Sequence, residues 1–267
     1  MSRADENIFA QERKQLIVEL VNRRVKITVA ELCEEFNVSP ATVRNDLREL
    51  EFAGLLQRTH GGALSNKKVT FDRPYTERLV ENQAEKQAIG RLAASLVEEG
   101  DKIIIDVGTT TRELALSLAE KQDVTVVTND LEVAYHMNAF AKSKIFVTGG
   151  FLRTNFNTLV GESALNALND IHVNKAFLSA EGITLDKGAT ITDMNVASVK
   201  KKFLQSADQV ILLADSSKFG KTAFTRFADI DQVDMIITDA HADKKILDQY
   251  RSHNVKIKIA EVDETAF

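Results

Sequence analysis

The chain of 267 residues has one cysteine, two prolines and no long apolar run, and each of these scarcities excludes something. The single cysteine, Cys33, cannot form an intrachain disulfide, and its place on the apolar side of a predicted helix indicates a core residue. The first residues are charged, and no apolar run approaches the roughly 18 residues that a membrane-spanning helix needs. We therefore expect a cytoplasmic protein.

Clusters of metal ligands and nucleotide-binding loops are also missing. The five histidines are scattered without ligand spacing, which predicts no metal site. Neither G-x-G-x-x-G after a strand nor G-x-x-x-x-G-K-[ST] occurs, so no nucleotide cofactor is expected. Residues 1–70 carry a net charge of +1 and the remainder carries −6. This distribution keeps most of the acidic excess away from an N-terminal module that would approach phosphate.

The most informative stretch lies between residues 38 and 62. Ser39 is a favourable N-cap, and Pro40 is a favourable first residue of a helix. The helix that follows has an apolar stripe of Val43, Leu47 and Leu50, and an opposite face of Ala41, Arg44, Asn45 and Arg48. Arginine and amide side chains are the groups that read base edges and clamp phosphates, so we predict a recognition helix here.

The neighbouring segments complete a winged helix-turn-helix. Thr28 and Glu31 form a capping box for a second helix, residues 8–24 form a third, and residues 55–62 resemble a β-wing that ends in a glycine turn. We therefore expect residues 1–64 to bind double-stranded operator DNA. The predicted DNA contacts are Ser39, Thr42, Arg44, Asn45, Arg48, Arg58 and His60. A winged helix that binds only protein is the alternative, which an outward face without large apolar side chains disfavours.

The rest of the chain predicts a linker and an α/β domain. Residues 65–80 are polar and contain Pro74, which favours a linker. In residues 81–267 short apolar runs alternate with helical segments, which predicts a mainly parallel sheet covered on both faces. The candidate strands are residues 102–106, 124–128, 144–148, 176–180, 210–214, 234–238 and 255–260.

Small polar residues follow several of these strands, at the edge of the sheet where parallel α/β folds bind ligands. Residues 106–111 place a glycine and three hydroxyls at the start of a helix, whose free N–H groups and dipole attract an anion. Thr110 with Glu113, and Asn129 with Glu132, are possible helix caps. The joint position of these loops predicts a binding site for a ligand that carries an anionic group.

Two motifs, SPATVRNDL at residues 39–47 and HGGA at residues 60–63, resemble the DeoR-type family of bacterial sugar-operon regulators. The strand-end loops resemble the sensor domain of that family, a Rossmann-like fold similar to ribose-5-phosphate isomerase. The resemblance implies a repressor of a sugar-utilisation operon that a phosphorylated sugar relieves, with the phosphate at residues 108–111. The effector-binding residues that it implies are Asp106, Gly108, Thr109, Thr110, Thr111, Thr128, Asn129, Gly149, Gly150, Glu181 and Lys218. The chain departs from the family pattern at Asn45, where many members have arginine, and at Val196, where many have glutamate.

The alternative from another class is a sugar-phosphate isomerase or deaminase with an appended DNA-binding domain. Isomerisation needs a base at carbon and a proton carrier at oxygen, each within about 3 Å of its proton. Enzymes of this fold place two acids around one glycine-containing turn, whereas Glu181 is followed here by glycine, isoleucine and threonine. Asp193 or Asp215 would have to supply the second acid. We therefore expect a regulator without catalytic residues.

An oligomer is expected because one short recognition helix spans too few base pairs to specify a genomic site. The sequence therefore predicts a homo-oligomer, a dimer or a tetramer, that reads inverted half-sites. A purely structural protein would leave the polar strand-end loops without a purpose.

Overall fold

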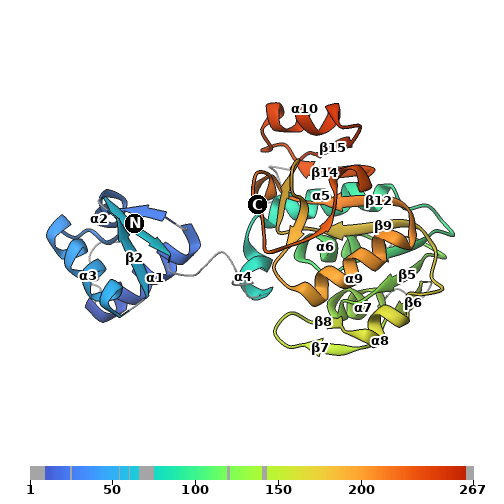
Figure 1. The fold of residues 1–267 in the computed structure, drawn as a ribbon, viewed down its shortest axis with the longest axis horizontal. Coiled ribbons are helices and arrows are strands. Elements are labelled where there is room, and N and C mark those ends of the chain that lie inside the picture. The colour runs from blue at the N-terminus through green and yellow to red at the C-terminus, as the bar shows by residue number, and fades with distance from the viewer. Residues whose placement is uncertain are drawn as a thin grey trace. The chain divides into compact units, whose positions relative to one another are not determined.

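The computed structural model describes residues 10–24, 26–53, 55–59, 61–65, 75–118, 121–139 and 143–262. The chain forms two compact units, Met1–Phe71 and Asp72–Phe267, and each unit has an apolar core of its own (Figure 1). The two units are described separately below.

The N-terminal unit is a winged helix-turn-helix, as predicted. Its elements are α1 (Ala10–Arg24), β1 (Lys26–Thr28), α2 (Val29–Phe36), α3 (Pro40–Phe52), β2 (Leu56–Thr59) and β3 (Gly62–Ser65). Strand β3 lies between β1 and β2 and is antiparallel to both. The predicted caps are confirmed: Thr28 and Glu31 form a capping box on α2, and the Ser39 hydroxyl accepts a hydrogen bond from the Thr42 amide at 3.2 Å.

The base of the wing depends on one glycine. A Cβ atom on Gly62 would lie 2.0 Å from the Ile27 carbonyl oxygen, so only glycine lets β3 approach β1 this closely. The Val29 amide, which opens α2, donates a hydrogen bond to the Gly61 carbonyl at 2.8 Å. These contacts join the wing to the helix that precedes the recognition helix.

A buried ion pair fixes the recognition helix α3 against α1. The Arg13 Nε atom donates to the Asp46 carboxylate at 2.7 Å, and Asp46 is only 3% exposed. A second pair, Lys14 with Glu49, joins the same two helices at the surface. Asp46 therefore has a structural role on the helix that also carries the predicted DNA contacts.

The C-terminal unit is an α/β domain built on a seven-stranded sheet. The strands of this sheet, in chain order, are β4 (Lys102–Ile105), β5 (Thr125–Thr128), β6 (Lys144–Val147), β9 (Val173–Ser179), β12 (Ala207–Leu213), β14 (Met235–Asp239) and β15 (Lys256–Ala260). Their spatial order is β15-β14-β12-β9-β4-β5-β6, and all neighbouring pairs are parallel. All seven predicted strands are confirmed, and β9 and β12 begin earlier than predicted.

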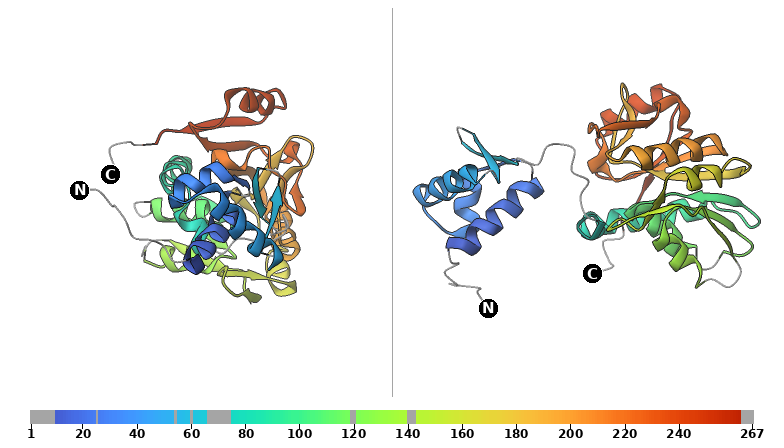
Figure 2. Two further views of the ribbon diagram at one scale, coloured as in Figure 1. Left: turned by 90° about the vertical axis from the view of Figure 1, so that its left-hand side faces the viewer. Right: turned by 60° about the horizontal axis from the view of Figure 1, so that its bottom comes forward.

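Helices cover both faces of this sheet (Figure 2), as the apolar runs predicted. The helices are α4 (Tyr75–Val80), α5 (Gln83–Ser95), α6 (Thr109–Ser117), α7 (Leu131–Met137), α8 (Glu162–Asn166), α9 (Met194–Gln205) and α10 (Lys244–Ser252). Alternate strand residues point to opposite cores. Ile103 and Ile105 belong to the cluster that contains α5 and α6, whereas Ile104 belongs to the cluster that contains α9 and α10.

The sequence did not predict two antiparallel additions to the sheet. One is the hairpin β7 (Phe151–Arg153) with β8 (Thr158–Val160), and the other is a small sheet of β10 (Gly182–Thr184), β11 (Gly188–Ile191) and β13 (Thr225–Ala228). These strands are three or four residues long, too short for their alternation to be recognised.

Residues 75–80, which the sequence pattern placed in the linker, form α4, and the Tyr75 ring is buried at 6% exposure. Two local predictions need correction. Helix α6 begins at Thr109 after Gly108, so Thr110 is not its N-cap. Helix α7 is capped by Asp130, whose carboxylate accepts from the Glu132 amide at 2.8 Å, because Asn129 is turned toward the β7–β8 hairpin. In the part of the chain that the structure describes, no helix is long and apolar enough to cross a membrane.

Replacing Asp46 with alanine tests the ion pair between α1 and α3. We expect a loss of about 3 kcal/mol in the unfolding free energy of the N-terminal unit, because Arg13 is left without its partner in a mostly buried position. Chemical denaturation followed by circular dichroism measures the change. Glu49→Ala, which removes the exposed pair between the same helices, is the matched control and should cost much less. Equal losses in the two variants would contradict the structural role of Asp46.

Candidate functional site

The topology of the sheet defines where a ligand site belongs. From β4 the chain adds β5 and then β6 on one side, and it returns to place β9, β12, β14 and β15 on the other. The strand order therefore reverses between β4 and β9, and the carboxyl ends of these two strands flank a crevice. Val107 follows β4, and Ser179 ends β9; the Ser179 hydroxyl donates to the Val107 carbonyl at 2.7 Å.

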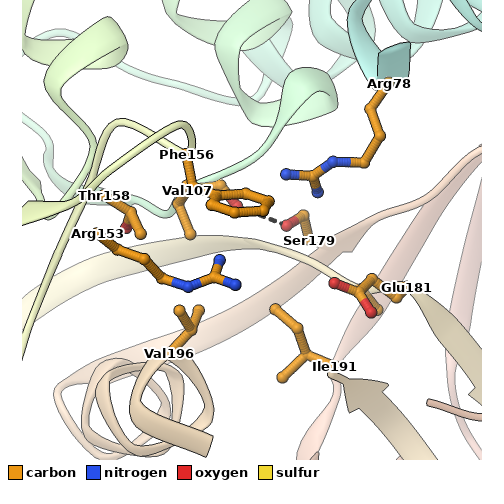
Figure 3. Close-up of a pocket in the computed structure, with 10 residues that line it drawn as sticks. Arg78, Val107, Arg153, Phe156, Thr158, Ser179, Glu181, Ile191 and Val196 are labelled. Carbon is orange, nitrogen blue, oxygen red and sulfur yellow. Dashed lines mark hydrogen bonds between the residues drawn. The ribbon is translucent and has the colours of Figure 1, made fainter. Parts of the chain in front are cut away.

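A pocket lies at this point (Figure 3), and its walls come from both strand ends and from elements outside the sheet. The lining residues are Arg78, Val107, Arg153, Phe156, Thr158, Ser179, Ala180, Glu181, Ile191 and Val196. Its volume is about 30 Å³. Small-molecule sites usually enclose about 300 Å³ or more, so a ligand larger than water has to displace side chains from this pocket.

Two arginines point into the pocket on either side of one aromatic ring (Figure 3). The Arg153 guanidinium carbon lies 3.7 Å from the centroid of the Phe156 ring, and the Arg78 carbon lies 5.8 Å from it. Arg153 also pairs with Asp193, the N-cap of α9, at 2.9 Å. The lining thus has two cationic side chains and one carboxylate, that of Glu181, so it favours an anion.

The Glu181 carboxylate is held in place by Thr192, which directly follows β11. Its Oε2 atom accepts hydrogen bonds from the Thr192 amide at 3.0 Å and the Thr192 hydroxyl at 2.6 Å. A carboxylate fixed in this way is a suitable acceptor for the hydroxyl groups of a polyol.

A buried network underlies the pocket. The Lys200 ammonium group, on α9, is fully buried and donates to the Asp106 carboxylate and to the Ser179 carbonyl. Asp106 also accepts from the Ser179 amide at 3.1 Å. Asp130 completes the floor beside the start of α6, where its carboxylate accepts from the Gly108 amide at 3.4 Å. Burial, with a smaller contribution from the neighbouring Asp106 carboxylate, raises the pKa of Asp130 to about 7.

Of the sequence-predicted effector residues, Glu181 is the one that lines this pocket. Thr109, Thr110 and Thr111 lie in the buried first turn of α6, next to the pocket residue Val107. Gly149 and Gly150 form the turn into β7 with positive φ angles. Lys218 pairs with Asp215 at 3.5 Å rather than reaching into the pocket.

Three further predicted residues support the pocket from behind. Asp106 is engaged by Lys200, and the Thr128 hydroxyl accepts from the Asp130 amide at 3.0 Å. The Asn129 amide group donates to the hydroxyl of Thr158, a lining residue, at 3.2 Å. These contacts hold the strand ends and the hairpin, although one carboxylate oxygen of Asp106 and the amide oxygen of Asn129 are buried without a hydrogen-bond partner among the described residues.

The sequence missed most of the lining. Arg78 stood in the predicted linker, and Arg153 with Phe156 stood in the unpredicted β7–β8 hairpin. Neither arginine follows a strand of the main sheet, which was the signal used to choose candidates. Val196 was noted as a departure from the family pattern, and it lies in the pocket wall.

The predicted DNA contacts lie on α3 and the wing. Arg44, Asn45 and Arg48 are exposed on one side of α3. Among the described residues, Arg44 and Arg48 make no ion pair, whereas Asn45 donates to Glu49 at 3.1 Å. His60 lies outside the described residues.

The wing and the end of α3 differ from the predicted DNA-binding surface in two respects. Arg58 pairs with Glu51 at 3.7 Å, so a phosphate would have to compete for its guanidinium. Phe52 is 96% exposed, contrary to the expected absence of large apolar side chains from this surface, because α3 extends beyond the apolar stripe that ends at Leu50. In the described part of the chain no group of three or more His, Cys, Asp or Glu side chains is arranged to hold a metal ion.

These two units define a DNA-binding protein of the winged-helix class with an appended α/β domain. The model of the DeoR-like helix-turn-helix domain matches residues 13–69, and that of the DeoR C-terminal sensor domain matches residues 81–240. The chain belongs to the DeoR family of transcriptional regulators.

Relatives along nearly the whole chain agree with this assignment. The transcriptional repressor AccR of Agrobacterium fabrum is 37% identical over 86% of this chain and 90% of its own. The HTH-type transcriptional repressor GlcR of Bacillus subtilis is 35% identical over 96% of this chain and 99% of its own. Among solved structures, ribose 5-phosphate isomerase from Methanocaldococcus jannaschii matches 52% of this chain and 55% of its own, with 16% identity and a TM-score of 0.40. That likeness is too low to bear on activity.

Proposed function

We propose that this regulator is a repressor of a sugar-utilisation operon. A phosphorylated sugar that binds in the pocket between the ends of β4 and β9 releases it from its operator. The observation that carries the proposal is the pair of arginines, Arg78 and Arg153, directed into one pocket beside the start of α6. Guanidinium groups bind phosphate through two parallel hydrogen bonds, and the N-terminus of a helix adds further donors.

The remaining lining supports a sugar as the other part of the ligand. Glu181, Ser179 and Thr158 offer acceptors and hydroxyls, while Phe156 offers an aromatic face. A sugar phosphate would displace the Phe156 ring from between the arginines and use the polar groups on the opposite wall. Release of DNA requires that the ligand bind one arrangement of the protein better than another, since equal affinity would shift no equilibrium.

The contacts of the two candidate second acids favour a regulator over an isomerase. Asp193 caps α9 through the amides of Asn195 and Val196 and pairs with Arg153. Asp215 is fully buried and accepts hydrogen bonds from Asn82 and Ser217. Both carboxylates thus have structural partners, which leaves Glu181 as the one acid among the lining residues.

We further propose a homo-oligomer. Strand β6 is an edge of the large sheet, and exposed apolar side chains gather on it and on the adjoining elements α7 and β7. These side chains are Leu131, Tyr135, Phe146, Val147, Phe151 and Leu152. An unprotected edge with an apolar patch is suited to pairing with a second copy of the chain.

Ligand binding is tested by isothermal titration with glucose 6-phosphate, ribose 5-phosphate, inorganic phosphate and the unphosphorylated sugars. We expect a phosphorylated sugar to bind, and Arg153→Gln to weaken that binding about 10- to 100-fold, because a hydrogen bond to a charged group contributes about 1.5–3 kcal/mol. Arg226→Gln, at an exposed position that pairs with Asp229, is the matched control and should leave the affinity unchanged. A phosphorylated sugar that binds the Arg153 variant normally would place the ligand elsewhere.

DNA recognition by α3 is tested in gel-shift assays with a duplex selected from a random library. The double variant Arg44→Ala/Arg48→Ala should lose at least tenfold in affinity, since one bidentate base contact contributes about 1–3 kcal/mol. Arg251→Ala, on α10, removes an exposed arginine of the other unit and should have no effect. Unchanged binding by the folded double variant would contradict the assigned recognition face.

The oligomer is tested by light scattering. The wild type should be at least a dimer at concentrations that saturate the DNA, and Phe146→Asp/Phe151→Asp should be smaller, because carboxylates would be buried in the apolar contact. Phe224→Asp is the control, because this ring is 64% exposed but outside the β6 edge. A monomeric wild type, or a double variant of unchanged mass, would refute this interface.

A further inference from the structure

One residue of the pocket lies on α4, the first helix of the C-terminal unit. This residue is Arg78, and α4 follows directly on the segment that leads from the winged helix. All other lining residues come from positions at least 29 residues further along the chain, the nearest being Val107. Any effect of the pocket on α4 by direct contact with a ligand would therefore pass through Arg78.

The Arg78 guanidinium is poorly satisfied where it lies. Its Nε atom is buried and has no hydrogen-bond partner among the described residues, and the group approaches Phe156 only at 5.8 Å. A buried donor without an acceptor destabilises the arrangement that contains it. Arg153, in contrast, already has the Asp193 carboxylate at 2.9 Å. An anion that enters the pocket therefore forms a more stabilising interaction with Arg78 than with an arginine that already has a carboxylate partner.

The C-terminal end of α4 is held to the rest of the domain by two hydrogen bonds. Lys86, on α5, is 3% exposed and donates to the Arg78 carbonyl in the last turn of α4. Asn82, in the turn after α4, donates to the buried Asp215 at 2.9 Å. Hydrogen bonds thus tie the C-terminal end of α4 to the body of the domain, Tyr75 at its first position is buried, and the Arg78 side chain reaches into the pocket.

We infer that Arg78 is the residue that couples the pocket to the DNA-binding unit: the anionic group of the effector draws the Arg78 guanidinium to itself and thereby fixes α4, the first helix after the winged-helix unit. This inference rests on the proposed function. It assigns different roles to the two arginines. Arg153 contributes to the affinity for the ligand, whereas Arg78 contributes both to affinity and to the response of the DNA-binding unit.

The test is the ratio of operator dissociation constants measured with and without saturating ligand, for the full chain and two variants. The probe is glucose 6-phosphate, or ribose 5-phosphate if that binds instead, on the selected duplex. In the wild type and in Arg153→Gln at saturation we expect a ratio of about 10 or more, within the usual range of allosteric coupling. In Arg78→Gln at saturation we expect a ratio within about threefold of unity. Titration calorimetry verifies that each variant is saturated.

Hydrogen exchange provides a second readout that does not involve DNA. Saturating ligand should slow exchange of the amides of residues 75–80 in the wild type and in Arg153→Gln, but not in Arg78→Gln. If Arg78→Gln binds ligand and still shows the wild-type ratio and the wild-type protection, the inference is wrong while the proposed function stands. If no phosphorylated sugar binds the wild type, the proposed function itself is wrong.

Discussion

The crevice between the ends of β4 and β9 depends on the buried ion pair between Lys200 and Asp106. One ammonium group, carried by a helix on one face of the sheet, joins the end of β4 to the end of β9, between which the strand order reverses. The Lys200 Nζ atom lies 5.1 Å from the centroid of the Phe227 ring. Removing one partner of such a pair typically costs about 3–5 kcal/mol, because the other charge remains in an apolar environment. The two strand ends that flank the crevice are therefore held together by this pair.

The groups directed into the crevice have a different origin from those that form it. The sheet supplies a floor of strand-end backbone and small side chains, whereas Arg78 lies on α4, Arg153 ends β7, and Phe156 lies in the loop between β7 and β8. The pocket thus combines a floor that belongs to the sheet with walls that lie outside it. Strands buried between two apolar layers resist displacement, whereas α4 and the loop between β7 and β8 contribute no residue to either core.

Sequence patterns predicted the architecture because each relevant signal is local. Apolar runs marked all seven strands of the large sheet, and the capping residues Thr28 and Ser39 marked the helices of the winged unit. The residues of the pocket could not be predicted in this way, because they come from segments far apart in the sequence. Arg78 and Arg153 are 75 positions apart and lie in segments whose structure depends on tertiary packing. The polar residues after the strands were mostly used to hold the strand ends together, as Asp106 and Asn129 do, and sequence alone cannot separate such a residue from one that faces a ligand.

The attachment of the β7–β8 hairpin separates one wall of the pocket from the two apolar cores. The hairpin is fastened to the sheet at its base, where Asn129 bonds to Thr158 and to the Leu159 carbonyl, while Phe156 lies in the connecting loop. Substitutions in that loop alter the wall of the pocket but touch neither core of the domain. The lining of the pocket can therefore be changed one loop position at a time on an unchanged scaffold, so residues 154–157 are the natural targets for engineering this wall.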